Sequence, residues 1–299
     1  MDGSGQINGQ GSPWWRQAGN SDYINATNTN CNRPTALHFY NCNGLQLSGL
    51  NHLNSPRNHI SISGCNGVTI SNLHISAPQD SPNTDGIDIS FSSHVNIHDC
   101  VIGTGDDCVA LDNGSSIINI TGVACGPGHG ISVGSLGENG SHETVEEVLV
   151  QGCSFNGTEN GARIKTWPGG SGYARHITFE NITLIDVQNP IIIDQHYCNG
   201  EDHCRNDQGS AIKVSDVTYR LVQGSSASKK AIDLDCSKRV ACTNIVMDQI
   251  NITSAVPGAQ IFASCNNAYG TSSSTTPNVP CLSKSPYIDS NLVAVNVTN

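Results

Sequence analysis

The 299-residue sequence has few charged side chains, few aromatic side chains and almost no methionine. Charged residues make up 13% of the chain, aromatic residues 5%, and methionine occurs twice. No apolar run approaches the roughly 20 residues that a membrane-spanning helix needs, and helical periodicity is hard to find anywhere. These absences argue against a membrane-spanning chain and against a mainly helical fold.

Positive charge is scarcest. The chain has 14 Lys and Arg against 25 Asp and Glu, which gives a formal net charge of −11. This balance argues against binding to nucleic acid or to an anionic membrane surface. The 11 histidines would offset much of the charge in a mildly acidic compartment.

Glycine, with 31 residues, and cysteine, with 13, are abundant, and Asn, Ser and Thr occur throughout. This composition is typical of a long all-β chain with many short strands and turns. The cysteines favour an oxidising, extracellular compartment. The Asn-x-Ser/Thr acceptors agree with secretion: Asn25, Asn113, Asn119, Asn139, Asn156, Asn181, Asn251 and Asn296. Because no apolar signal segment precedes Met-Asp-Gly-Ser-Gly, we interpret the N-terminus as incomplete or processed.

One pattern, apolar-x-apolar-x-x-apolar-x-apolar, recurs along the chain and predicts two short strands joined by a bend. Its copies begin at Val68, Val95, Ile118, Val148, Ile177, Ile212 and Ile245, with a poorer copy at Leu45. A third short strand lies between successive copies, as at Ile87–Ile89 and Val109–Leu111. Three strands in 22 to 35 residues predict a right-handed parallel β-helix of about eight or nine coils. A β-propeller would need four strands in about 40 residues.

We predict one domain, a parallel β-helix over residues 1–299. Its coils run from about Leu37 to Phe262, after an incomplete first coil (1–35) and before a Ser/Thr-rich C-terminal tail (264–299). A solenoid end exposes strand edges and needs a cap. No capping helix is evident before Leu37, so an N-terminal cap is expected to be missing.

Three polar residues recur at one phase of the repeat. Asp85, Asp107 and His129 each stand two positions before an alternating apolar pair, and they are spaced 22 residues apart. Neighbouring coils lie about 4.8 Å apart, so the three should face one groove, with Asp106 at the corner beside Asp107. Carboxylates this close cannot all ionise freely, and a carboxylic acid beside a carboxylate suits glycoside hydrolysis. The alternative is that Asp-Gly and Gly-Asp-Asp are only turn residues at the corners.

The next strand, Arg163-Ile164-Lys165, places two cations on the face opposite Ile164. They suit a ligand that bears a carboxylate. The alternative is a structural salt bridge to the aspartates, and both roles can hold at once. Tyr197 ends the following coil's strand near the same edge; alone it indicates packing rather than function.

Together these motifs resemble the polygalacturonases, the pectin-degrading glycoside hydrolases. The four motifs occur in family order: Asn83-Thr84-Asp85-Gly86, Gly105-Asp106-Asp107, Gly128-His129-Gly130 and Arg163-Ile164-Lys165. The surrounding sequence is similar to the plant branch. The resemblance implies hydrolysis of α-1,4 bonds between galacturonic acids, with inversion and with no metal or cofactor.

The resemblance also implies a role for each matching residue. Asp106 would protonate the glycosidic oxygen, Asp85 and Asp107 would hold and deprotonate the attacking water, His129 would tune the acid, Arg163 and Lys165 would bind a galacturonate carboxylate, and Tyr197 would contact the sugar. Alternation alone favours Asp107 over Asp106, so the sequence does not separate these two roles. Adjacent coils suggest the roughly 5 Å separation of retaining enzymes, so inversion rests on the resemblance.

The cysteines fall into groups. The resemblance supports disulfides between Cys198 and Cys204, Cys236 and Cys242, and Cys265 and Cys281. Cys108 and Cys125 lie one coil apart and are expected to pair, whereas Cys100 and Cys153 occupy core positions of the repeat and should be buried thiols. The pairing of Cys31, Cys42 and Cys65 stays open. No Cys or His spacing resembles a zinc motif.

The sequence therefore predicts a secreted, monomeric cell-wall enzyme acting on pectin homogalacturonan, with endo action favoured because no bulky insertion lies near the site. A rhamnogalacturonan hydrolase would differ at His129, Arg163 and Lys165, and a pectate lyase would use a calcium cluster and an arginine base. The non-enzymatic alternative is a truncated, impaired homologue that binds pectin as a β-helix.

Overall fold

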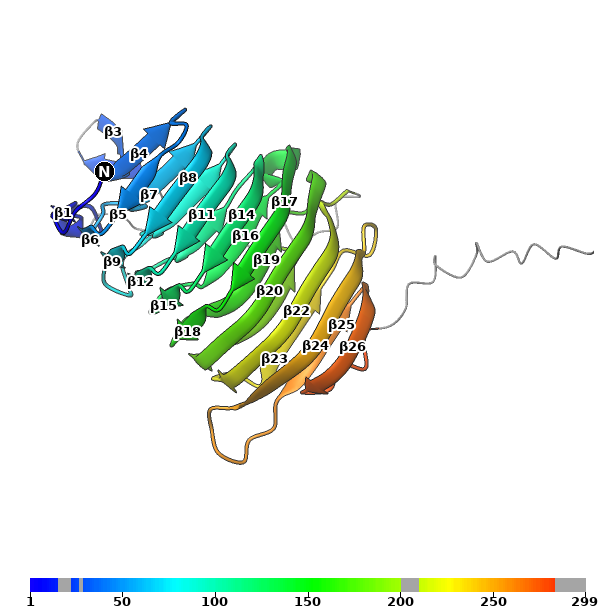
Figure 1. Cartoon of the computed structure of the whole chain (residues 1–299). Coiled ribbons are helices and arrows are strands. Elements are labelled where there is room, and N and C mark those ends of the chain that lie inside the picture. The colour runs from blue at the N-terminus through cyan, green and yellow to red at the C-terminus, as the bar shows by residue number, and fades with distance from the viewer. Residues whose placement is uncertain (16–22, 27–28, 200–209, 283–299) are drawn as a thin grey trace, which may run out of the picture.

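The computed structural model describes residues 1–15, 23–26, 29–199 and 210–282, without the side chains of 23–26 and 29–32. Its strands stack along one axis, from β1 at the N-terminal end to β26 near the C-terminal end (Figure 1). Strands from successive coils pair in parallel. The predicted right-handed parallel β-helix is confirmed.

One sheet contains nine parallel strands and carries the polar residues singled out above. The strands are β4 (Leu37–Tyr40), β7 (Ile60–Ser63), β10 (Ile87–Ser90), β13 (Val109–Leu111), β16 (Ile131–Leu136), β19 (Asn160–Thr166), β21 (Asn189–Asp194), β23 (Lys230–Asp235) and β25 (Phe262–Asn266). Ile87 pairs with Val109, and Val109 pairs with Ile131, so equivalent positions of successive coils align. These inward side chains are fully buried and stack into the core, where apolar burial contributes about 25 cal/mol per Å².

The second sheet begins as two rows of short strands. One row is β1 (Gln6–Asn8), β6 (Asn51–Leu53), β9 (His74–Ser76), β12 (Val101–Gly103), β15 (Ala124–Cys125) and β18 (Ser154–Asn156); the other is β5 (Gln46–Ser48), β8 (Asn66–Ser71), β11 (Ser93–His98), β14 (Ser115–Thr121) and β17 (His142–Gln151). The bend between the rows has a left-handed residue in each of several coils, among them Asn72, Asp99, Gly122 and Gly152. Asn, Asp and Gly adopt this conformation most readily.

The later coils differ from the predicted two-strand pattern. β20 (Ser171–Val187) pairs with both β17 and β18, and so joins the two rows into one strand. β22 (Lys213–Ser226) and β24 (Cys242–Ser254) continue as long strands beside it. The bend survives as a left-handed residue within β20, Asn181, and backbone pairing continues through it.

The N-terminal residues add to the stack. β1 pairs with β6, so residues 6–8 extend the sheet as the predicted first coil would. Between β1 and β4 lie a four-residue helix, α1 (Ser12–Trp15), and an antiparallel hairpin of β2 (Tyr23–Ala26) and β3 (Thr29–Asn32). A 3₁₀ turn, η1 (Glu138–Gly140), precedes β17. No helix in the described part of the chain is long and apolar enough to cross a membrane.

The predicted start of the C-terminal tail, at residue 264, is wrong, because the strands continue beyond it. Residues 262–266 form β25, which pairs with β23, and β26 (Ala268–Thr276) pairs with β24. The Ser/Thr-rich sequence misled the prediction because β26 is an outer strand. Most of its side chains are exposed, so it needs no apolar alternation.

Three predicted disulfides are confirmed: Cys108–Cys125, Cys236–Cys242 and Cys265–Cys281. Cys198 is buried, and its predicted partner Cys204 lies outside the described residues. Cys100 and Cys153 are buried free thiols, as predicted. Cys42 and Cys65 are also free, and the side chain of Cys31 is not described.

Candidate active site

The candidate site lies where three neighbouring strands of the nine-stranded sheet begin, beside Arg163 and Lys165 on the fourth strand, β19. Asp85 precedes β10, Asp106 and Asp107 precede β13, and His129 precedes β16. The pairing register aligns Ile87, Val109 and Ile131, and the three polar residues stand two positions before these in the sequence. The predicted phase therefore places Asp85, Asp107 and His129 on adjacent coils.

Asp107 is a buried carboxylate held by two cations. Arg163 Nη2 lies 2.5 Å from its Oδ1, and Lys165 Nζ lies 2.9 Å from its Oδ2. Ser132 Oγ donates a further hydrogen bond to Oδ1 at 2.7 Å and accepts one from Arg163 Nε at 2.8 Å. Burial alone would raise the pKa of Asp107, but Arg163 and Lys165 outweigh it and lower the pKa to about 2. Asp107 is thus fixed in its ionised form, and the salt bridge considered from the sequence is present.

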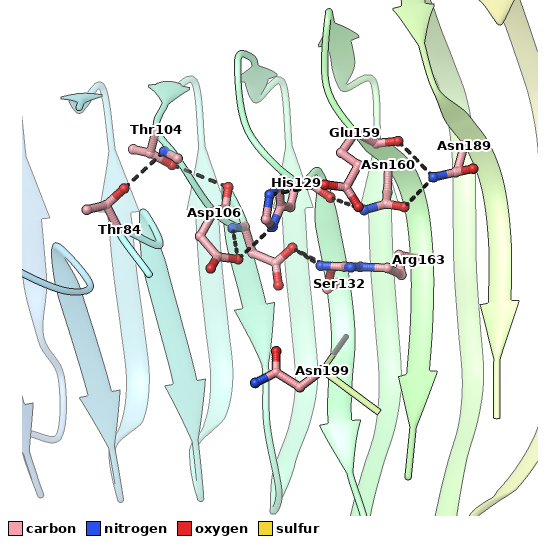
Figure 2. Close-up of polar contacts among 12 residues, drawn as sticks. Thr84, Thr104, Asp106, His129, Ser132, Glu159, Asn160, Arg163, Asn189 and Asn199 are labelled. Atoms are coloured by element: carbon pink, nitrogen blue, oxygen red, sulfur yellow. Dashed lines mark hydrogen bonds and ion pairs between the residues drawn. The ribbon is translucent and has the colours of Figure 1, made fainter. Parts of the chain in front are cut away.

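Asp106 faces the other way, toward His129. His129 Nδ1 lies 3.0 Å from Asp106 Oδ1, and His129 Nε2 lies 3.2 Å from Glu159 Oε2 (Figure 2). Burial lowers the pKa of His129, but the hydrogen bond and charge of Asp106, with the charge of Glu159, raise it above its ordinary value. The Asp106 side chain is 18% exposed whereas that of Asp107 is fully covered. Asp106 is therefore the carboxyl of the two that an incoming ligand can reach.

Backbone contacts hold the turn that carries Asp106. The amide of Gly105 donates to Thr84 Oγ1 at 3.0 Å, and the amide of His129 donates to Asp106 O at 2.8 Å. The amide of Asp107 donates to Asp106 Oδ1 at 2.8 Å. The turn is thus held by the coils on both sides, and the Asp106 carboxyl is held by its own coil and by His129.

Asp85 is the carboxyl group in this cluster that favours its protonated form. Burial raises its pKa well above the ordinary range, and the charges of Asp106 and Asp88 raise it further. Among the described residues its side chain makes no hydrogen bond. The raised pKa of Asp85 agrees with the expectation that at least one carboxyl pKa in this crowded cluster rises.

Tyr197 follows the end of β21 and reaches the same cluster. Lys165 Nζ lies 5.2 Å from the centroid of its ring, and Trp167 packs against it edge-on with centroids 5.4 Å apart. The Tyr197 hydroxyl donates to Asn199 Oδ1 at 3.1 Å. Tyr197 therefore has packing contacts and also sits beside a predicted substrate-binding cation.

The structure brings all seven sequence-predicted residues into one neighbourhood and adds three. Ser132 links Asp107 to Arg163, Glu159 contacts His129, and Asp88 adds charge next to Asp85. Ser132 could have been found, because it pairs in register with Arg163 on the outward face of the sheet. Glu159 lies in the turn before β19, where no periodic pattern marks it.

Asp106, Asp107 and His129 bring ligand atoms within 4.8 Å of one another, close enough to hold a metal ion. Their bonding does not suit one. Arg163 and Lys165 already neutralise Asp107, and both nitrogens of His129 face carboxylates. A cation added here would meet three positive groups.

Comparison with known proteins identifies the family of the chain. The family described as "Glycosyl hydrolases family 28" matches residues 1–276. A probable polygalacturonase of Arabidopsis thaliana is 53% identical over 285 residues, which cover 94% of this chain and 60% of that protein. A polygalacturonase of Cryptomeria japonica is 48% identical over 253 residues, 84% of this chain and 48% of that protein. The chain thus spans 48% to 60% of the length of these two relatives.

Solved structures show the same fold. Endo-xylogalacturonan hydrolase from Aspergillus tubingensis superposes with a TM-score of 0.75 at 26% identity, over 90% of this chain and 74% of that one. Endopolygalacturonase I from Stereum purpureum, solved with two galacturonate molecules, gives a TM-score of 0.68 at 22% identity, over 90% and 78% of the two chains. With the match over residues 1–276, these findings mean that the chain belongs to glycosyl hydrolases family 28.

Proposed function

We propose that this chain is a polygalacturonase that hydrolyses α-1,4-galacturonosyl bonds of pectin homogalacturonan with inversion and without a cofactor, as a secreted monomer in the plant cell wall. One observation carries the proposal. An accessible Asp106–His129 pair lies beside a carboxylate, Asp107, that Arg163 and Lys165 keep ionised. Glycoside hydrolysis requires this division of labour between an acid and a base.

In the proposed reaction Asp106 donates its proton to the glycosidic oxygen as the bond to the anomeric carbon breaks. A water held by Asp85 and Asp107 attacks that carbon from the opposite face and gives up a proton to Asp107, the carboxylate that Arg163 and Lys165 keep ionised. Asp85, whose pKa burial raises, holds this water by hydrogen bonding. The product sugar and the leaving chain then each carry a new hydroxyl.

Substrate binding can explain how Asp107 becomes available. In the structure both of its oxygens are occupied by Arg163, Lys165 and Ser132. A galacturonate carboxylate would compete for the same two cations, with Arg163 able to contact it in two places and Lys165 as a point charge. Once Arg163 and Lys165 turn toward the substrate carboxylate, Asp107 would face the water. The Tyr197 ring would lie against the sugar.

The test is hydrolysis of polygalacturonic acid by the purified chain. We expect new reducing ends, no unsaturated product absorbing in the near ultraviolet, and an early fall in viscosity if the action is endo. The Asp106→Asn variant should lose nearly all turnover, because a carboxamide cannot donate the proton.

A folded chain that binds galacturonan but releases no reducing ends would overturn the proposal in favour of a pectin-binding β-helix. An unsaturated product that absorbs in the near ultraviolet would instead indicate a lyase, which breaks the bond without adding water. Circular dichroism of the parent and the variant checks that both are folded.

A further inference from the structure

The imidazole of His129 lies between two carboxylates. Asp106 Oδ1 is 3.0 Å from Nδ1, and Glu159 Oε2 is 3.2 Å from Nε2. Asp106 belongs to the predicted site, whereas no sequence motif marks Glu159. Figure 2 shows the three side chains in a row across neighbouring coils.

The backbone of Glu159 is fixed against His129 and the next coil. Its amide donates to Gly128 O at 2.8 Å, and its carbonyl accepts a hydrogen bond from Asn189 Nδ2 at 3.2 Å. The neighbouring Asn160 donates from Nδ2 to His129 O at 3.2 Å (Figure 2). The contact with His129 is thus supported by the backbone on both sides and does not depend on a free loop.

The protonation of the ring follows from these two contacts. A neutral imidazole has one N–H and one bare nitrogen, so it can donate to only one of the two carboxylates. The other carboxylate would then face a lone pair at hydrogen-bond distance, which is repulsive. Both contacts are favourable when the Asp106–His129 pair holds one further proton: either His129 is an imidazolium that donates from both nitrogens, or a protonated Asp106 donates to Nδ1 while Nε2–H donates to Glu159.

We propose that Glu159 is a positioning residue that holds the proton of the Asp106–His129 pair through its charge at Nε2, so that the pair retains this catalytic proton to higher pH. This inference rests on the proposed function. The charged groups that face His129 are Asp106, Glu159 and Asp107, with burial acting against all three. Arg163 and Lys165 compensate the charge of Asp107, so Glu159 and Asp106 supply most of the stabilising charge.

Loss of the Glu159 charge therefore has a defined sign. Asp106 and His129 share a hydrogen bond, so the charge of Glu159 acts on the proton that the two side chains hold between them. Removing a nearby negative charge makes it easier for the pair to lose its proton, wherever that proton resides. Glu159 is about half exposed, so solvent screens the effect, and a contact of this kind corresponds to a shift of about 0.3 to 0.7 pH unit.

The experiment compares Glu159→Gln with the parent on polygalacturonic acid from about pH 4 to pH 8. We expect the alkaline limb of kcat/KM to move to lower pH by about 0.3 to 0.7 unit, with rates on the acidic side within about twofold. Glu180→Gln is the matched control, because Glu180 also carries an ion pair, with Arg220, on the second sheet. It should leave the profile where the parent has it.

A second readout does not depend on activity. The titration of His129, followed by NMR of histidine-labelled protein and assigned with His129→Asn, should have a lower midpoint in Glu159→Gln than in the parent. Unchanged midpoint and unchanged alkaline limb would overturn the role of Glu159. An inactive parent whose His129 midpoint still depends on Glu159 would instead reject the proposed reaction and leave the contact standing.

Discussion

Asp106 and Asp107 show what a sequence pattern can and cannot specify at the level of single residues. Strand alternation favoured Asp107 for either role, since Asp107 is in phase with Asp85 and His129. The structure separates the neighbours by their partners: Asp107 is covered by Arg163 and Lys165, and Asp106 faces His129. The difference depends on the path of the corner, which a two-residue period does not describe.

The remaining site residues follow the same division. The period of the repeat placed Asp85, Asp107, His129 and the two cations, because each has a fixed position on a strand or just before one. Glu159 acts on His129 from the neighbouring coil, and Asp88 acts on Asp85 from the same coil. Such contacts depend on side-chain directions in three dimensions, and no spacing in the sequence encodes them.

The two aspartates should fail in different ways when changed to asparagine. Asp107→Asn would leave Arg163 and Lys165, both nearly buried, without their counter-charge, which costs about 3–5 kcal/mol of stability. Asp106→Asn removes a carboxyl that is partly exposed, so its stability should change by less than about 1 kcal/mol while turnover is lost. Guanidinium unfolding of both variants measures this contrast. Equal stability of the two would mean that the buried ion pairs do not anchor the site.

At the scale of strands, the sequence predicted the coils where inward positions are apolar. The inward side chains that alternate along β10, β13 and β16 are apolar and fully buried: Ile87, Ile89, Val109, Leu111, Ile131 and Val133. The prediction was wrong where backbone pairing does not need that pattern. β20 runs through a left-handed residue, and β26 pairs with β24 through mostly exposed Ser and Thr. Hydrogen bonds to a neighbouring strand stabilise these segments whatever their side chains.

The junction of β6 and β7 contains a buried histidine pair that should make the fold sensitive to acid. His52 Nδ1 lies 2.9 Å from His59 Nδ1, and the outer nitrogen of each ring is buried without a partner among the described residues. Burial lowers the pKa of His52 to about 4; burial and the charge of His52 lower that of His59 to about 3. Between the ordinary pKa of 6.5 and these lowered values, the unfolded chain binds protons that the folded chain does not. The free energy of unfolding therefore decreases as the pH is lowered through this range.

Guanidinium unfolding at a series of pH values tests this pair. The double variant His52→Asn/His59→Asn should lose less stability than the parent as the pH falls below about 6.5. The measurement must be the difference in stability between the two proteins. Burial raises the carboxyl pKa values of Asp85, Asp88 and Asp112, and these groups stabilise the folded chain as the pH falls. Exposed His94→Asn is the control. Parallel curves for parent and double variant would show that the pair does not contribute.

For the whole molecule, the site's position in the stack follows from the repeat. β10, β13, β16 and β19 have two coils of the same sheet before them, β7 and β4, and three after them, β21, β23 and β25. The stacked core therefore supports the site on both sides, and the site lies away from both ends of this sheet. A rigid, regular sheet holds groups from four coils in fixed register, which suits a site that must orient two carboxylates and a water.

The net charge of the molecule opposes the proposed substrate. The formal charge is −11 at pH 7, and galacturonan is a polyanion, so the two repel over a Debye length of about 30 Å at 0.01 M salt and about 10 Å at 0.1 M. The attraction of Arg163 and Lys165 acts at contact, from a nearly buried position that salt screens less. Raising the salt concentration from about 0.01 to about 0.1 M should therefore increase kcat/KM on long galacturonan several-fold. A trigalacturonate substrate, which carries few charges beyond the site, should respond less. If salt instead lowers kcat/KM on the long polymer, local cations dominate the approach and the net charge has no influence on association.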